Sequence, residues 1–131
     1  FFHFNVDLAQ GPCVIKRLRG CGAGCEYVAI TPEGDIYPCH QFVGNEDYKL
    51  GSLYDGTFDK ELSGRFAGLN IYTREECRDC WARFYCSGGC SASNLLVNGD
   101  IKKPHRVGCE LERKRLECAI ALRAIAAGMA E

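Results

Sequence analysis

The sequence lacks the features that mark membrane and nucleic-acid-binding proteins. No run of apolar residues reaches the ~18 that a membrane-spanning helix requires. Its 16 lysine and arginine residues are balanced by 17 aspartate and glutamate residues, which leaves a formal net charge of −1. Because a nucleic-acid-binding surface normally carries an excess of basic residues, we expect neither a nucleic acid nor a membrane as a partner.

Bulky core residues of some types are also scarce. The 131 residues include only one tryptophan and one methionine, whereas glycine occurs 15 times. This length fits one domain, and a hydrophobic content of 47% is enough for a modest core. A chain of this size that is rich in glycine and cysteine indicates a loop-heavy fold held together by more than apolar burial. We therefore predict one irregular α+β domain spanning residues 1–131.

The beginning of the chain has no initiator methionine, no basic segment and no cleavage site of small residues in the string FFHFNVDLAQGPC. We therefore expect a fragment of a longer protein, whose N-terminal part carries the main chemistry.

A β-hairpin is the clearest local prediction. Residues 26–30 and 36–39 flank the turn sequence TPEGD, so the second strand delivers Cys39 at its end. Residues 1–12 and 48–53 are predicted to add short strands.

Three helices are predicted from apolar spacing and from helix-start residues. Residues 54–69 indicate a helix that begins near Asp55 or Thr57. Residues 91–98 indicate a short helix that ends at Asn98-Gly99, and a long helix is expected from Val107 or Cys109 to Ala127. We expect Cys118 to be a buried thiol on an apolar stripe of this long helix, together with Leu111, Arg115, Leu122 and Ile125.

The ten cysteines are the most informative feature, because their spacing is specific. Residues 77–90 contain C-x2-C-x5-C-x3-C and are expected to form loops and tight turns, in which Gly88-Gly89 lets the backbone approach a metal cluster closely. Thiolates gathered on short loops are the ligands of soft metals and iron–sulfur clusters. Such close pairs suit chelation better than cross-linking. We therefore expect a reducing, cytoplasmic setting, with a disulfide-bonded domain as a rival interpretation.

The number of cysteines allows two sites of four ligands each, with two cysteines to spare. A 4Fe–4S cluster takes four thiolates, and so does a structural zinc ion. A zinc-binding interaction module is therefore the alternative to a protein that holds iron–sulfur clusters.

The complete cysteine pattern resembles that of a known family. It reads C-x12-G-x4-C, then C-x2-C-x5-C-x3-C, then one further C, and comprises Cys21, Gly34, Cys39, Cys77, Cys80, Cys86, Cys90 and Cys109. This pattern resembles the SPASM domain, the C-terminal extension of many radical S-adenosylmethionine peptide maturases. The strings CGAGCEYVAITPEGDIYPCHQFVG and CRDCWARFYCSGGCSASN resemble the maturases of SCIFF peptides, in which a cysteine is linked through sulfur to a neighbouring residue.

The resemblance implies two auxiliary 4Fe–4S clusters with interleaved ligands. The second auxiliary cluster would be held by Cys77, Cys80, Cys86 and Cys109. The first would be held by Cys21, Cys39 and Cys90. For the fourth ligand of the first cluster we choose Cys13, with Cys25 as the alternative, while a third option leaves one iron open for a substrate thiolate.

The family's catalytic motif, C-x3-C-x2-C, is absent, because Val28 and Ser93 stand where its third cysteine would be. The resemblance therefore implies an auxiliary domain without its radical-generating barrel, so that S-adenosylmethionine would bind only in the N-terminal part of the parent chain. The expected partners are that radical S-adenosylmethionine domain and a cysteine-rich precursor peptide. The expected role is electron transfer and peptide binding during thioether formation, and the chain alone is expected to have no turnover.

Overall fold

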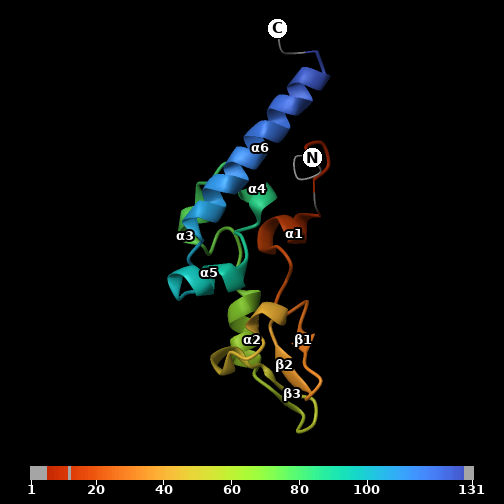
Figure 1. Ribbon diagram of the computed structural model, residues 1–131, viewed down its shortest axis with the longest axis vertical. Helices are drawn as coiled ribbons and strands as arrows, with labels where there is room; N and C mark the ends of the chain where they lie inside the picture. The colour runs from red at the N-terminus through yellow and green to blue at the C-terminus, as the bar shows by residue number, and fades with distance from the viewer. Residues whose placement is uncertain (1–5, 12, 129–131) are drawn as a thin grey trace.

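The computed structural model describes residues 6–11 and 13–128. A small β-sheet lies at one end of an elongated molecule, and the long helix α6 (Arg106–Ala126) projects from the other end (Figure 1). Short helices occupy the middle. The prediction of an α+β fold with a hairpin and a long C-terminal helix is confirmed.

The sheet is antiparallel, and its order follows the sequence. Its strands are β1 (Ala29–Ile30), β2 (Asp35–Tyr37), β3 (Gly51–Ser52) and β4 (Thr57–Phe58). The predicted hairpin is confirmed, with Ala29 opposite Tyr37 and Ile30 opposite Ile36. The short strand expected within residues 48–53 is β3.

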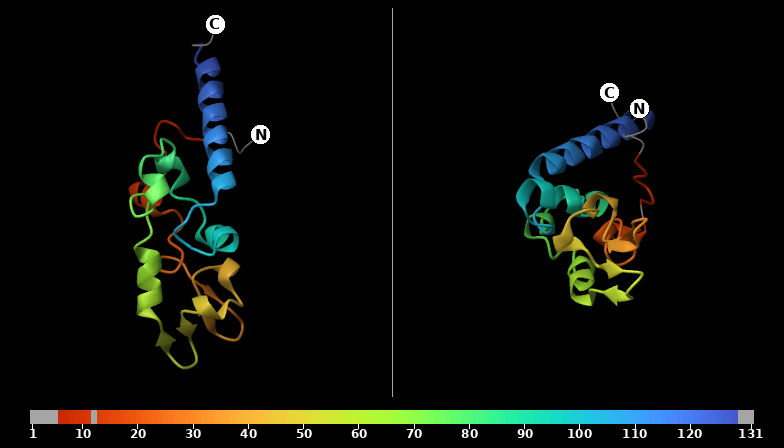
Figure 2. Two further views of the ribbon diagram at one scale, coloured as in Figure 1. Left: turned by 90° about the vertical axis from the view of Figure 1, so that its left-hand side faces the viewer. Right: turned by 60° about the horizontal axis from the view of Figure 1, so that its bottom comes forward.

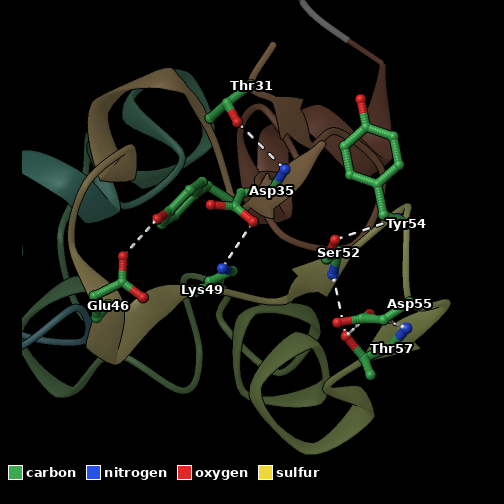
Figure 3. Close-up of polar contacts among 9 residues, drawn as sticks. Thr31, Asp35, Glu46, Lys49, Ser52, Tyr54, Asp55 and Thr57 are labelled. Atoms are coloured by element: carbon green, nitrogen blue, oxygen red, sulfur yellow. Dashed lines mark hydrogen bonds and ion pairs between the residues drawn. The ribbon is translucent and has the colours of Figure 1, made fainter. Parts of the chain in front are cut away.

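The hairpin turn requires glycine at one position. Gly34 has a φ of +81°, and a Cβ atom there would lie 2.7 Å from the ring of Tyr54. Its backbone N–H donates to the carbonyl of Thr31 over 2.9 Å. An ion pair of 2.7 Å between Lys49 Nζ and Asp35 Oδ1 ties β2 to the segment before β3 (Figure 3). These contacts fix β2 and therefore the cysteine that follows it.

The main apolar core lies between the sheet and two helices, η2 (His40–Phe42) and α2 (Lys60–Ala67). The rings of Phe42 and Phe66 meet edge to face with centroids 5.4 Å apart. A further 3-10 helix, η3 (Glu46–Tyr48), packs its Tyr48 side chain against this core. The larger buried apolar side chains of this core are Ile36, Tyr37, Phe42, Leu50, Leu62, Phe66, Leu69 and Ile101.

The predicted start of α2 is wrong. Asp59 is the N-cap, and its side chain accepts a 2.8 Å hydrogen bond from the backbone N–H of Leu62. Thr57 instead lies in β4, and Asp55 accepts from the N–H of Thr57 in the turn before that strand. Pairing of β4 with β3 keeps the backbone extended as far as Phe58, which delays the helix.

The cysteine-rich section is more regular than expected. Two one-turn helices, α3 (Glu75–Arg78) and α4 (Arg83–Cys86), replace the predicted loops, because helical turns satisfy the backbone polar groups between the cysteines. Helix α5 (Ser91–Asn98) ends at Gly99 in the left-handed conformation, as predicted. Helix α1 (Val14–Arg19) packs against α4.

The two ends of the chain differ from the predictions in detail. The strand predicted within residues 1–12 lies partly outside the described residues, and residues 6–11 form a turn in which Asp7 accepts hydrogen bonds from the N–H groups of Ala9 and Gln10.

Helix α6 has the predicted length, but its apolar stripe is wrong. Its buried residues are Leu116 and Ala119, whereas Leu122 and Ile125 are 54% and 63% exposed. Cys118 is half-buried. The distal half of α6 projects away from the sheet and the short helices (Figure 2). No helix among the described residues is long and apolar enough to cross a membrane.

Candidate metal centres

Seven of the predicted ligands gather in two groups. The second group comprises Cys77, Cys80, Cys86 and Cys109, and these four residues line one small cavity. The first group comprises Cys21, Cys39 and Cys90: the pKa of Cys39 is raised mainly by burial and also by the nearby Cys90 and Cys21. Residues far apart in sequence are thus brought together in each group.

Helical turns position the second group. Cys77 lies in α3, Cys80 follows α3, and Cys86 ends α4. Cys109 lies in the first turn of α6, and both Cys109 and Glu112 line the cavity. Three separate chain segments therefore supply the four thiols.

Burial disfavours the thiolate form of three cysteines of the second group in the metal-free protein. It raises the pKa of Cys77 to about 11, against the opposing effect of the Arg74 guanidinium. Burial likewise raises the pKa of Cys86 and of Cys109. Since a bound metal replaces the thiol proton, these buried thiols suit a site in which a cation compensates the thiolate charges.

Backbone N–H groups favour the thiolate form of one sulfur in each group. The amides of Gly88 and Gly89 lower the pKa of Cys86, against the larger effect of its burial. The amides of Gln41 and Phe42 act in the same way on Cys39, whose pKa is raised mainly by burial. Hydrogen bonds from the backbone to sulfur are one of the means by which a protein sets the potential of an iron–sulfur cluster.

The loop that carries Cys21 is fixed beside Cys39. The backbone N–H of Gly24 donates to the carbonyl of Pro38 over 3.0 Å. The carbonyl of Gly24 in turn accepts a 2.7 Å hydrogen bond from Ser63 Oγ in α2. The core between the sheet and α2 therefore holds this loop against the end of β2.

The third member of the first group arrives from the cysteine-rich section. Cys90 is the N-cap residue of α5, and its neighbours Gly89 and Ser91 share a small cavity with Cys21. Cys86 and Cys90, which only three residues separate, are thus assigned to different groups. This is the interleaving of ligands that the resemblance implies.

The two candidates for a fourth ligand of the first group lie in different places. Cys25 lines the same cavity as Cys21, and its Sγ donates a 3.4 Å hydrogen bond to the carbonyl of Gly22. Cys13 is exposed at the start of α1 and does not line that cavity. Cys25 therefore shares a cavity with Cys21, one member of the first group, and the choice between Cys13 and Cys25 stays a prediction.

The donor sets fit the implied clusters. All ten cysteines have free thiols. Within residues 6–11 and 13–128, no three His, Cys, Asp or Glu side chains meet closely enough to hold a single metal ion, and the four thiols of the second group instead surround a cavity. Four thiolates around such a space are the donors that a 4Fe–4S cluster takes.

Two buried polar side chains hold the segments that carry the cysteines, and the sequence analysis missed both. Arg74 is 3% exposed and Asn94 is 1% exposed. Asn94 Oδ1 accepts from the N–H of His105 over 2.9 Å, and Nδ2 donates to the carbonyl of Ile101 over 3.4 Å. The polar string TREEC gives no sign that its arginine is buried, so no sequence signal would have found it.

Comparisons with known proteins find similarity to an iron–sulfur family. Residues 21–81 match the SPASM family, described as an iron–sulfur cluster-binding domain. An uncharacterised protein of Archaeoglobus fulgidus is 32% identical over 98 residues, which cover 72% of this chain and 23% of that protein. The mycofactocin maturase of Mycobacterium ulcerans is 31% identical over 110 residues, 79% of this chain and 28% of that enzyme. The PqqA peptide cyclase of Xanthomonas axonopodis pv. citri is 28% identical over 102 residues, 72% of this chain and 27% of that enzyme.

The chain therefore spans only about a quarter of the length of the curated relatives it matches. The predicted resemblance to the SPASM family is confirmed over residues 21–81, while the closer resemblance to SCIFF maturases stays a prediction.

Proposed function

Because this chain carries an iron–sulfur cluster-binding domain of the SPASM family, we propose that residues 1–131 form the auxiliary-cluster domain of a radical S-adenosylmethionine peptide maturase. The observation that carries the proposal is the convergence of seven motif cysteines into two interleaved groups. Its relatives named as a peptide cyclase and a maturase support the class of parent enzyme.

Each group would hold one 4Fe–4S cluster. The second group supplies four thiolates, which is a full set of ligands. The first group supplies three, and Cys13 or Cys25 is the candidate for the fourth. If neither residue binds, one iron of this cluster stays open to the thiolate of a substrate.

The proposed chemistry is thioether formation in a cysteine-rich precursor peptide. The whole enzyme would remove a hydrogen atom from the peptide, join a cysteine thiolate to the resulting carbon radical, and pass the one remaining electron to an acceptor. When bound, the auxiliary clusters supply that one-electron acceptor. The residues of this chain hold the thiolates, donate backbone N–H groups to sulfur and limit access of water.

The partners would be the radical S-adenosylmethionine domain of the same parent chain and the precursor peptide. S-adenosylmethionine would bind in that domain, since the motif for its cluster is absent from these residues. A reducing compartment such as the cytoplasm suits a chain with ten free thiols.

Ligand variants test the proposal. In anaerobically reconstituted chains, Cys77→Ser should lose about four of roughly eight iron atoms, because one four-iron cluster loses a ligand. Cys39→Ser should lose the other cluster. Cys118→Ser is the matched control, because Cys118 is half-buried outside both groups, and its iron content should be unchanged. Full iron content in Cys77→Ser would overturn the assignment of the second group.

The same measurement assigns the fourth ligand. If Cys25 binds the first cluster, Cys25→Ser lowers its iron content or changes its spectrum, while Cys13→Ser has no effect. The reverse result would select Cys13. No effect of either variant would favour the open iron.

A further inference from the structure

Arg74 lies between the two cysteine groups and is more buried than any other charged residue among those described. We propose that Arg74 is a positioning residue that ties both groups of ligands together and provides a buried positive charge shared by the two clusters. This inference rests on the proposed function, because it needs two clusters in the proposed places.

The guanidinium fork joins the segments that carry the ligands. Its Nη1 donates to the carbonyls of Ile101 and Lys102 over 2.6 and 2.8 Å, in the connection that leads to α6. Its Nη2 donates to Ser91 Oγ over 3.0 Å, directly after Cys90. Arg74 itself is the N-cap residue of α3, the helix that contains a ligand of the second group.

The stem of the side chain packs against the loop between the two groups. A Cβ atom on Gly88 would lie 2.9 Å from Cδ and 3.0 Å from Nε of Arg74. Gly88 has a φ of +85° and stands between Cys86 and Cys90. Glycine at this position therefore allows the backbone to cross directly over the arginine at the point where the chain passes from one group to the other.

The positive charge has no direct partner of its own. No carboxylate among residues 6–11 and 13–128 forms an ion pair with Arg74; its hydrogen bonds go to carbonyls and a hydroxyl. Burial lowers the pKa of Arg74, and the groups that oppose this effect when they are ionised are the thiols of Cys77, Cys86 and Cys90 and the carboxyl group of Asp100. A buried charge without compensation is costly. Because an iron–sulfur cluster with thiolate ligands carries net negative charge, loading both groups would supply the compensation.

This arrangement has a consequence for the redox behaviour of the clusters. Reduction by one electron adds negative charge to a cluster, and a fixed positive charge nearby favours that step. Net charge and burial are among the factors that set cluster potentials. Since the guanidinium binds Ser91, directly after Cys90, and Arg74 caps the helix that contains Cys77, we expect its charge to raise the reduction potential of both clusters.

Substitution at Arg74 separates the charge from the hydrogen bonds. Arg74→Gln removes the charge, whereas Arg74→Lys keeps the charge and loses the planar fork. The matched control is Arg78→Gln, because Arg78 lies between Cys77 and Cys80 but is exposed to solvent, which screens its charge. The chains are reconstituted anaerobically, their iron is counted, and each cluster is titrated with dithionite while its reduced signal is followed by electron paramagnetic resonance.

We expect Arg74→Gln to shift the midpoint potentials of both clusters to more negative values. Arg74→Lys should hold both potentials near those of the unmodified chain, with some loss of iron, and Arg78→Gln should change little. Unchanged potentials in a fully loaded Arg74→Gln chain would overturn the inference. If the Arg74→Gln chain does not hold clusters, the test passes to Arg74→Lys. An Arg74→Lys chain that holds both clusters at the potentials of the unmodified chain supports the role of the charge. Failure of both variants to hold clusters overturns the role of the charge.

The iron content of the unmodified chain separates this inference from the proposed function. An unmodified chain that holds no iron contradicts the proposed function itself. If the unmodified chain holds its clusters and the Arg74→Gln chain has the same cluster potentials, only the role of Arg74 is contradicted.

Discussion

The sheet region (residues 21–69) and the cysteine region (residues 70–119) are stabilised in different ways. The sheet region buries large apolar side chains, such as Phe42, Leu50 and Phe66, in one core. In the cysteine region the buried set includes the charged Arg74, the polar Asn94 and the thiol of Cys77. The first region can fold through apolar burial, whereas the second, which also buries Ile71, Ile101 and Leu116, depends in addition on polar contacts and, in our proposal, on bound metal.

Removal of iron should produce the largest difference in stability between the two regions. Because metal binding contributes directly to the free energy of folding, we expect the amides of α3 and α4 to exchange faster, but still more slowly than in the unfolded chain, once the clusters are removed by a chelator and an oxidant. The amide of Leu50, which donates to the carbonyl of Ile36 over 2.7 Å, should keep its protection. Equal loss of protection in both regions would show that the sheet region also needs the metal.

A core truncation tests the sheet region next. Leu50 is 1% exposed, so Leu50→Ala should lower the free energy of unfolding by about 2–5 kcal/mol. Leu53→Ala is the control, because Leu53 is 58% exposed and its truncation should cost less than about 0.5 kcal/mol. Urea denaturation of the metal-free chain measures both. Equal costs for the two variants would rule out a core that contains Leu50.

The buried thiols give the cysteine region a pH dependence. The pKa of Cys77 is raised by burial from 9.0 to about 11. Between these values the unfolded chain releases the thiol proton while the folded chain keeps it, so stability falls as pH rises. For Cys77 alone the loss is on the order of 2 kcal/mol, and the raised pKa values of Cys86 and Cys109 act in the same direction.

Urea titrations of the metal-free chain at pH 8.5 and pH 11 measure this loss of stability. Cys77→Ser is the comparison, because it removes one thiol but leaves the other groups that titrate in this range. A loss of the same size in Cys77→Ser would contradict the contribution assigned to Cys77.

The cap of α2 should have the smallest effect. Asp59→Ala removes the acceptor for the backbone N–H of Leu62 and should lower the free energy of unfolding by about 1 kcal/mol. Asp59→Asn keeps an acceptor and should cost less. Thermal unfolding distinguishes the two variants, and no difference between Asp59→Ala and the unmodified chain would show that this cap does not stabilise the fold.

The sequence predicted those parts of the fold that depend on contacts between residues close together in the chain. The hairpin around Gly34 and the end of α5 at Gly99 were predicted, because turn and helix-end geometry depend on neighbouring residues. The start of α2 was not predicted, because pairing of β4 with β3 decides where the helix begins. Such pairing is a contact between strands and leaves no mark in the residues at the helix start.

The same distinction applies to the candidate metal centres. Cysteine spacing indicated a metal or cluster site, whereas the division of the thiols into two groups came from the family resemblance, because Cys90 follows Cys86 closely in sequence and yet belongs to the other predicted group. The burial of Arg74 was not predictable, since it results from contacts with Ser91 and Ile101, which lie 17 and 27 residues away. The exposed distal half of α6 was missed for the related reason that apolar spacing does not show whether a neighbouring surface exists.

The most direct test of two auxiliary clusters is the content of iron, acid-labile sulfide and zinc in the anaerobically purified chain, measured together with its visible spectrum. We expect about eight iron atoms per chain with matching sulfide and visible absorption, which corresponds to two 4Fe–4S clusters. A colourless chain that contains one or two zinc ions, and that takes up no iron on anaerobic reconstitution, would contradict the proposal and favour a structural zinc module.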